Sequence, residues 1–256
     1  MSYKTVKKSC GIALCRYTDK FQILMVKKRY SYSYADFVAG KYSCADENKI
    51  SSLFSGMTSE EKMEIESNNF SQMWYRIWRY NPEIENCSSK ERGNYNIAKK
   101  KYISTSKKHD LIEMLNNTKI SDCIWDIPKG RINKEEKDIT CAIREMQEET
   151  NISTDFYRLY PHCVNDYHYD AGVKYINNFY IATETVLVEP KINYKNKHQI
   201  SEIIDIRWMG IDEIKREDST GRYLRVSKMI FNILRKNYGI SKIIKSPCNQ
   251  DTPCIV

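Results

Sequence analysis

Three glutamates in one short stretch of the chain carry the side chains best suited to chemistry. Glu148 and Glu149 lie three and four residues after Glu145, so a helix would make them surface neighbours of that residue. Like charges at these spacings repel by roughly 0.2–0.5 kcal/mol per pair, so the cluster needs a cation or full solvation. Magnesium takes oxygen ligands and bridges carboxylates to substrate phosphates. The cluster therefore indicates a divalent metal site, with a solvated acidic surface as the alternative.

Three further residues near the glutamates have types that a metal site would use. Gly130 precedes them, and a glycine lets a bare backbone carbonyl approach a cation closely. Arg144 adjoins Glu145, and its planar guanidinium is a fork that can orient a carboxylate. Glu136 adds a carboxylate eight residues before Arg144. The combination favours the metal site over the solvated surface.

These residues are expected on a helix that runs from about Asp138 to Thr150. Its apolar residues recur at i, i+3, i+4 and i+7, which predicts a stripe facing a core: Ile139, Ala142, Ile143 and Met146. After such a helix the backbone usually turns through the left-handed region, where Gly is favoured and Asn is next best. Asn151 stands at that position.

The whole stretch from residue 125 to 152 resembles the signature of the Nudix hydrolases. Its pattern is G-x5-E-x7-R-E-U-x-E-E, where U is a bulky aliphatic residue, and the final Gly of the signature is replaced by Asn151. The resemblance implies an α+β fold, the Nudix αβα sandwich. Membership of this superfamily does not by itself select a substrate.

The residues around this stretch predict a catalytic part that is interrupted by a helical insertion. Residues 8–17 and 21–28 look like two antiparallel strands joined by a turn. Some ninety residues then intervene before the signature, and they read as helical. The predicted organisation is residues 1–31 and 123–245 for the Nudix domain, 32–122 for the inserted helical domain, and 246–256 for a disordered tail.

Within the insertion, Thr58 and Glu61 form a capping box. An apolar stripe at helical spacing predicts core rather than a stacking platform: Phe70, Met73, Trp74, Ile77 and Trp78. Residues 81–108 have few large apolar side chains and two lysine runs, at 99–101 and 107–108, and read as a basic connector. The basic segments are candidates for contacts along a phosphate backbone.

Downstream of the signature, residues 156–160 and 174–183 look like strands, with residues 168–172 as a turn before the second. Asp170 either shapes that turn or projects toward the metal site. Residues 202–208 predict another strand, with Glu202 at its start, and residues 221–238 predict a long helix.

The composition of the chain indicates which cellular compartment and which class of binding partner to expect. The net charge is +8 although the proposed site is acidic, which suits a polyanionic partner bound elsewhere on the surface. The nine cysteines contain no C-x2-C pair, so a disulfide framework or zinc site is not indicated and a reducing compartment is expected. No apolar run has the length of a signal peptide or a membrane span, so we expect an intracellular protein without a membrane partner.

A closer resemblance extends over most of the chain. Residues 28–31, 73–78, 125–130 and 140–145 resemble the decapping Nudix enzymes of large cytoplasmic DNA viruses, which carry a helical insertion at the same place. The resemblance implies hydrolysis of the 5′ cap of messenger RNA, with release of 7-methyl-GDP and 5′-monophosphate RNA. It also implies capped mRNA as the partner, bound through a basic surface and the insertion, a cytoplasmic location in an infected host cell, and homodimerisation through the insertion.

The resemblance assigns roles to individual residues. Glu145 and Glu149 would be the principal ligands of Mg²⁺ or Mn²⁺, helped by Glu148 and the Gly130 carbonyl, with Arg144 beside them. Glu202 is the first candidate for the general base and Glu149 the second. The remaining candidates would contact substrate, by neutralising phosphate charge or by stacking on the cationic 7-methylguanine: Lys28, Arg29 and Lys129 for the former, Tyr32 and Tyr175 for the latter.

Two other functions remain open on the sequence. A basic pocket would equally serve a Nudix phosphohydrolase that acts on diphosphoinositol polyphosphates or nucleotides. A non-catalytic RNA-binding protein on a Nudix scaffold is the third hypothesis, and the intact glutamate set argues against it because binding alone does not need crowded carboxylates.

Overall fold

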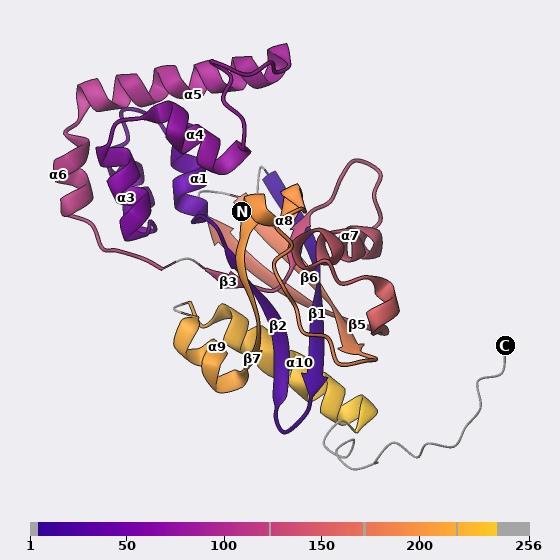
Figure 1. The fold of residues 1–256 in the computed structure, drawn as a ribbon. Coiled ribbons are helices and arrows are strands. Elements are labelled where there is room, and N and C mark those ends of the chain that lie inside the picture. The colour runs from indigo at the N-terminus through magenta and orange to yellow at the C-terminus, as the bar shows by residue number, and fades with distance from the viewer. Residues whose placement is uncertain (1–4, 123, 171–172, 219, 240–256) are drawn as a thin grey trace. The chain divides into compact units, whose positions relative to one another are not determined.

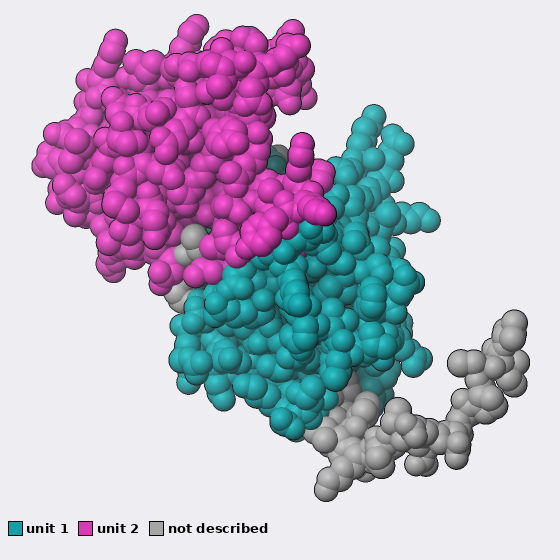
Figure 2. Space-filling model, in the orientation of Figure 1, with its two compact units in different colours: residues 1–26, 125–193, 205–256 teal, residues 27–124, 194–204 magenta. Residues whose placement is uncertain are grey.

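The computed structural model describes residues 5–122, 124–170, 173–218 and 220–239 (Figure 1). The tail at residues 246–256, expected to be disordered, and the side chain of Asp170 lie outside the described residues. The chain divides into two compact units, drawn in different colours in Figure 2. Unit 1 comprises Met1–Val26, Trp125–Asn193 and Asp205–Val256, and unit 2 comprises Lys27–Ile124 and Tyr194–Ile204.

Unit 1 is built on a mixed sheet with strand order β3-β2-β1-β6-β5, to which β4 adds beside β1 and β7 beside β2. The strands are β1 (Thr5–Tyr17), β2 (Phe21–Lys28), β3 (Trp125–Asp126), β4 (Lys129–Arg131), β5 (Tyr157–Asp170), β6 (Val173–Glu184) and β7 (Ile203–Gly210). The predicted hairpin is confirmed, because β1 and β2 are antiparallel with Cys15 opposite Ile23. β1 is also antiparallel to β4 and parallel to β6. It therefore holds the short strand β4 in place beside the predicted metal site.

Helices cover both faces of this sheet. They are α7 (Asp138–Thr150), the short 3-10 helix η1 (Thr154–Phe156), α9 (Ile211–Glu217) and α10 (Arg222–Tyr238). Cys10 of β1 lies beside Cys141 of α7, whereas Phe21 of β2 packs on Phe231 of α10 with ring centroids 5.0 Å apart. The pairing of β2 with β1 places Phe21 on the same face of the sheet as Cys15. Cys15 and Cys10 are an odd number of residues apart along β1, so they lie on opposite faces. Since strand residues alternate between faces, α7 and α10 lie on opposite sides, which confirms the expected αβα sandwich.

Unit 2 confirms the mainly helical insertion after the first strands. Its helices are α1 (Tyr32–Val38), α2 (Glu47–Ser55), α3 (Ser59–Glu66), α4 (Phe70–Trp78), α5 (Ser89–Lys108), α6 (Leu111–Asn116) and α8 (Lys197–Glu202). The capping box of Thr58 and Glu61 is confirmed at the start of α3. The Glu61 carboxylate is fully buried and also accepts hydrogen bonds from the N–H and the hydroxyl of Ser31, at 2.6 and 2.8 Å. One satisfied charge thus fixes the starts of both α1 and α3.

The aromatic stripe of α4 forms core, as the sequence predicts. Phe70, Met73, Trp74 and Ile77 are buried, and Trp78 stacks on Trp74 with ring centroids 3.7 Å apart. Among the described residues, no helix combines the length and the apolar composition that crossing a bilayer requires.

The interpretation of residues 81–108 as a basic connector is wrong over most of its length, because α5 is a helix of 20 residues. It begins at a second capping box, made by Ser88 and Glu91. Its buried side is a narrow stripe of aromatic and small residues: Tyr95, Ala98, Tyr102 and Thr105. Such a stripe contains no large aliphatic residue, so counting large apolar side chains missed it.

The strands after α7 are longer than expected. β5 and β6 form one antiparallel hairpin that continues through residue 168, where a turn was expected, and an irregularity between Leu159 and Cys163 interrupts its register. The predicted strand at residues 202–208 begins one residue later, because Glu202 is the last residue of α8. The long final helix is confirmed as α10.

Candidate active site

α7 presents its glutamates in different environments. Glu145 and Glu149 are buried, at 8% and 3% exposure, while Glu148 is half-buried. The apolar side of the helix holds Cys141, Ala142 and Met146 without exposed surface. Asn151 ends the helix in the left-handed conformation at φ 59°, the geometry expected there. Two carboxylates are therefore held in a poorly solvated position, which is costly unless cationic or donor groups compensate them.

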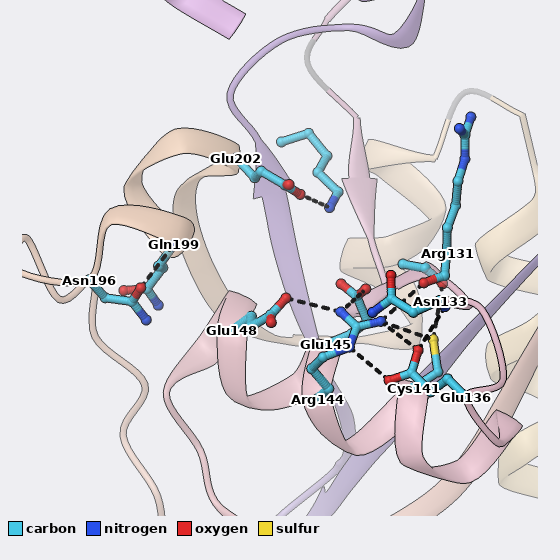
Figure 3. Close-up of polar contacts among 12 residues, drawn as sticks. Arg131, Asn133, Glu136, Cys141, Arg144, Glu145, Glu148, Asn196, Gln199 and Glu202 are labelled. Atoms are coloured by element: carbon cyan, nitrogen blue, oxygen red, sulfur yellow. Dashed lines mark hydrogen bonds and ion pairs between the residues drawn. The ribbon is translucent and has the colours of Figure 1, made fainter. Parts of the chain in front are cut away.

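Arg144 connects three of the carboxylates near α7 (Figure 3). Its Nε and Nη2 donate to the two oxygens of Glu136 at 2.9 and 3.0 Å, so that pair is bidentate. Its Nη1 donates to Glu145 at 2.6 Å and to Glu148 at 3.1 Å. Nη2 also donates to the Arg131 carbonyl at 3.0 Å. The guanidinium fork thereby fixes α7 to the loop that precedes it.

The charges of this network shift the pKa values of its members. Hydrogen bonds from the Arg144 guanidinium and the Asn133 backbone N–H lower the pKa of Glu136 to about 2. The same bond to Glu136, with those to the other carboxylates, raises the pKa of Arg144 above its usual range despite partial burial. Both groups are therefore charged at neutral pH, and Glu136 acts as a permanent counter-ion that orients the guanidinium.

Gly130 is required by a close approach rather than by an unusual backbone angle. A Cβ on this residue would lie 2.1 Å from the Glu145 carboxyl carbon, so any side chain would displace the carboxylate. The Gly130 carbonyl accepts a hydrogen bond from the Cys141 thiol at 3.5 Å. Strand β4 and helix α7 thus bring a backbone carbonyl and the Glu145 carboxylate together.

The donors gathered here suit a hard divalent cation. Glu145, Glu148, Glu149 and the Gly130 carbonyl supply oxygen atoms, which Mg²⁺ prefers, and the Glu145 carboxylate occupies the place beside Gly130 that a Cβ would fill. In the conformation of the described residues, no three acidic, histidine or cysteine side chains converge as a metal cage. The carboxylates of Glu145 and Glu148 instead turn toward Arg144.

The structure gives three of the predicted phosphate-binding cations different surroundings. Lys129 is buried and pairs with the fully buried Asp126 at 2.6 Å. Lys28 is buried and lies 3.7 Å from the Glu202 carboxylate. Arg29 is half-buried, and its backbone N–H donates to the Glu202 carbonyl at 2.7 Å. Glu202 and these two neighbours belong to unit 2, whereas α7 belongs to unit 1.

The two predicted cap-binding tyrosines are also divided between the units. Tyr32 starts α1 and is 49% exposed. Tyr175 on β6 stacks on His168 with ring centroids 4.6 Å apart, and the Lys7 ammonium lies 5.3 Å from its ring centre. Asp170 ends β5, and its side chain lies outside the described residues.

Sequence reasoning overlooked a buried acid in unit 1. Asp166 of β5 is 2% exposed and accepts from Arg222 at 2.5 Å and from Arg225 at 2.6 Å, both on α10. Arginines three residues apart share one side of a helix, which is a signal that a buried acid faces them. Asp166 lies between the predicted strand at residues 156–160 and the predicted turn at 168–172, in a segment for which no element was predicted, whereas β5 runs through it.

Comparison with known proteins gives three findings. A NUDIX domain model matches residues 108–228. The mRNA-decapping protein g5R of African swine fever virus (isolate Warthog/Namibia/Wart80/1980) is 31% identical over 221 residues, covering 82% of this chain and 87% of the viral protein. The asymmetrical bis(5′-nucleosyl)-tetraphosphatase of Rattus norvegicus is 31% identical over 112 residues, covering 40% of this chain and 73% of the rat protein.

Proposed function

The chain belongs to the Nudix family, as a relative of the viral mRNA-decapping proteins, and on this premise we propose that it hydrolyses the 5′ cap of messenger RNA. The products are 7-methyl-GDP and an RNA with a 5′ monophosphate. One observation carries the proposal: the 31% identity extends over 82% of the chain, well beyond the residues 108–228 that match the Nudix domain.

The metal site belongs to α7 and β4. Glu145 and Glu149 would be the main ligands of Mg²⁺ or Mn²⁺, with Glu148 and the Gly130 carbonyl completing the oxygen set. A cation held there supplies Lewis-acid polarisation of the phosphoryl oxygens and of the attacking water. Glu145 and Glu148, which accept hydrogen bonds from Arg144, would hold the cation, and Glu136 would keep the guanidinium in place through two hydrogen bonds. Arg144 is therefore a positioning residue in this mechanism.

A carboxylate must take the proton of the attacking water. Glu202 is the first candidate, since it is half-exposed and its charge is balanced by Lys28 at 3.7 Å. Glu149 is the second, and it lies on the metal-binding helix itself. The two roles separate kinetically, because loss of a base changes the acidic limb of the pH–rate profile, whereas loss of a ligand raises the metal concentration required.

Substrate contacts are proposed for both units. Lys28, Arg29 and Lys129 would offset phosphate charge, Tyr32 and Tyr175 would stack on 7-methylguanine, and Asp170 would contact substrate near the metal. The exposed lysines of α5 would follow the RNA backbone. A protein that removes caps from messenger RNA would act in the cytoplasm of an infected cell. Exposed Ile97 and Ile103 on α5 support homodimerisation through the insertion, which sedimentation of the full chain tests.

The decisive experiment incubates the protein with cap-labelled RNA and Mg²⁺ or Mn²⁺ and identifies the released nucleotide. Wild type should release 7-methyl-GDP, while Glu149→Gln should lose at least a hundredfold in rate and still bind RNA. Glu135→Gln is the matched control, because this carboxylate lies in the same stretch and its side chain is 85% exposed. If wild type hydrolyses a diphosphoinositol polyphosphate but leaves the cap intact, the RNA substrate is wrong and the small-molecule alternative holds.

A further inference from the structure

Unit 2 contains a hollow of about 600 Å³ whose lining residues all belong to that unit. The end of β2, the first turn of α3, one side of α4 and residues 120–122 form its wall. α3 and α4 pack against each other, as Figure 1 shows. Four of the lining side chains carry a guanidinium group or an aromatic ring: Arg29, Tyr75, Arg76 and Arg79.

The charge of Arg76 is balanced inside the fold. Its Nη1 forms an ion pair with Glu64, and its guanidinium lies 5.6 Å from the ring centre of Tyr34. The Tyr34 hydroxyl donates to the other oxygen of Glu64 at 2.5 Å. Arg76 Nη2 also donates to the Arg29 carbonyl at 3.4 Å. Arg76 therefore builds the wall of the hollow.

Arg29 and Arg79 differ from Arg76, because no carboxylate within the described residues forms an ion pair with either of them. The Arg29 Nε is buried and has no hydrogen-bond partner among the described residues. Burial, and then the charges of Arg79 and Arg76, lower the pKa of Arg29. The guanidinium groups of Arg29 and Arg79 repel each other, and neither forms an ion pair with a carboxylate of the described residues. An anionic ligand would stabilise this arrangement.

The backbone also holds Arg79 in an unfavourable conformation. It caps the C-terminus of α4 at φ 58° and ψ 24°, the left-handed region where glycine is favoured. Its Nη2 donates to the Ile200 carbonyl at 3.2 Å, and its guanidinium lies 6.0 Å from the ring centre of Tyr75. Tyr75 is 46% exposed, so an exposed aromatic side chain lines the same hollow as the two arginines.

The balance of charge selects the kind of anion. Four cationic side chains line the hollow, and three carboxylates oppose them, from Glu60, Glu64 and Asp122. The net formal charge of +1 suits one phosphodiester, which carries a single negative charge. A densely charged inositol polyphosphate would meet the exposed Glu60 and Asp122 as repulsive neighbours. Proteins that bind single-stranded nucleic acids also combine cationic side chains for the phosphates with aromatic rings on which bases stack.

We propose that this hollow binds one nucleotide of an RNA chain, with Arg29 and Arg79 holding the phosphodiester and Tyr75 stacking on a base. The inference rests on the proposed function, since it gives the RNA substrate a contact outside the metal site.

The test measures the Kd of the full chain for a labelled, uncapped single-stranded RNA without divalent metal, as a function of salt. Arg79→Gly removes the guanidinium at a position whose backbone favours glycine, so it should keep the Tm while lowering affinity and reducing the slope of log Kd against log salt by about 0.7. Tyr75→Ala should weaken binding about tenfold, and Tyr75→Phe, which keeps the ring, should not. Arg235→Ala on α10 removes an exposed charge of unit 1 as the control.

The proposal is overturned if Arg79→Gly and Tyr75→Ala bind RNA as tightly as wild type does. Loss of inositol hexakisphosphate binding in Arg79→Gly with RNA binding unchanged overturns it as well. Release of 7-methyl-GDP is assayed in parallel. If wild type releases the nucleotide and the variants bind RNA normally, this inference fails and the proposed function stands. If the variants lose RNA binding but wild type never cleaves the cap, the proposed function fails instead.

Discussion

At the scale of residues, the candidate site depends on how one arginine distributes its donors. Five N–H groups in a fixed plane allow Arg144 to hold Glu136 by both oxygens and still reach Glu145 and Glu148. A lysine would offer a single point charge on a flexible stem, without the paired geometry. The positions of the carboxylates therefore depend on the shape of the side chain as much as on its charge.

We expect Arg144→Lys to lower cap hydrolysis by about 10- to 100-fold, in the range seen when groups that orient metal ligands are lost. The Mg²⁺ concentration for half-maximal activity should rise, because Glu145 and Glu148 lose their orientation. Titration of activity against Mg²⁺ measures both effects. The control is Arg131→Lys, which keeps the carbonyl that Arg144 uses and alters only an exposed side chain. Equal activity of the two variants would contradict the positioning role.

The sequence predicts the identities of these residues but not their pairings. The spacing of Gly130, Glu136 and Arg144 is visible along the chain, since it depends on one loop and one helix. The pairs of Lys129 with Asp126 and of Lys28 with Glu202 arise where segments approach in three dimensions. Periodicity carries no information on such contacts, so charges that looked available for substrate proved to have partners inside the fold.

At the scale of elements, α5 shows what a hydrophobicity count overlooks. Every fourth or third residue on its buried side is tyrosine, alanine or threonine, and the remaining positions are mostly polar. The strands, α4, α7 and α10 were predictable because bulky apolar residues mark their buried sides. The Ser88 and Glu91 capping box was the available signal for α5, equivalent to the box that identified α3.

Gly93 provides a direct test of α5. It lies inside the helix, and a Cβ built there meets no atom within 4 Å, so Gly93→Ala should stabilise the protein by about 0.5–1 kcal/mol through reduced freedom of the unfolded chain. Differential scanning calorimetry should show a Tm higher by roughly 1–4 °C. Gly40→Ala, at φ +68°, should lower the Tm. A decrease for both variants would mean that residue 93 is not helical.

Glu83 predicts a pH dependence of the helical unit. Hydrogen bonds from Lys99, Ser71 and Tyr95 lower its pKa to about 2, from an ordinary value of about 4.3. A lowered pKa in the folded state stabilises the protein above the unfolded pKa, and that contribution disappears as the pH falls from about 4.3 to about 2. Glu83→Gln should therefore be less stable than wild type at pH 6 and nearly equal to it near pH 2. Urea denaturation at each pH measures the difference, and a gap that persists at pH 2 would rule out the ionic explanation.

At the scale of the whole molecule, the positive charge is concentrated in one helix rather than in one unit. The segments of unit 2 contain 18 basic and 14 acidic residues, so their net charge of +4 is half of the total of +8. α5 alone has seven basic residues and one glutamate among its 20 residues. The rest of unit 2 is therefore slightly acidic. An RNA attracted to the insertion would meet its main electrostatic contact along α5.

This distribution predicts where RNA affinity resides. Lys100 and Lys107 are exposed and seven residues apart, so they project from one side of α5, about 10 Å apart along its axis. Replacing both with Gln should reduce the salt slope for single-stranded RNA by about 1.4, because each phosphate contact contributes about 0.7. Lys228 and Lys236 on α10 are also exposed, and replacing them removes the same charge from unit 1. Both variants should cleave a short cap analogue at the wild-type rate, since neither alters α7. Equal slopes for the two double variants would show that RNA responds to net charge alone, and α5 would then have no specific role as its track.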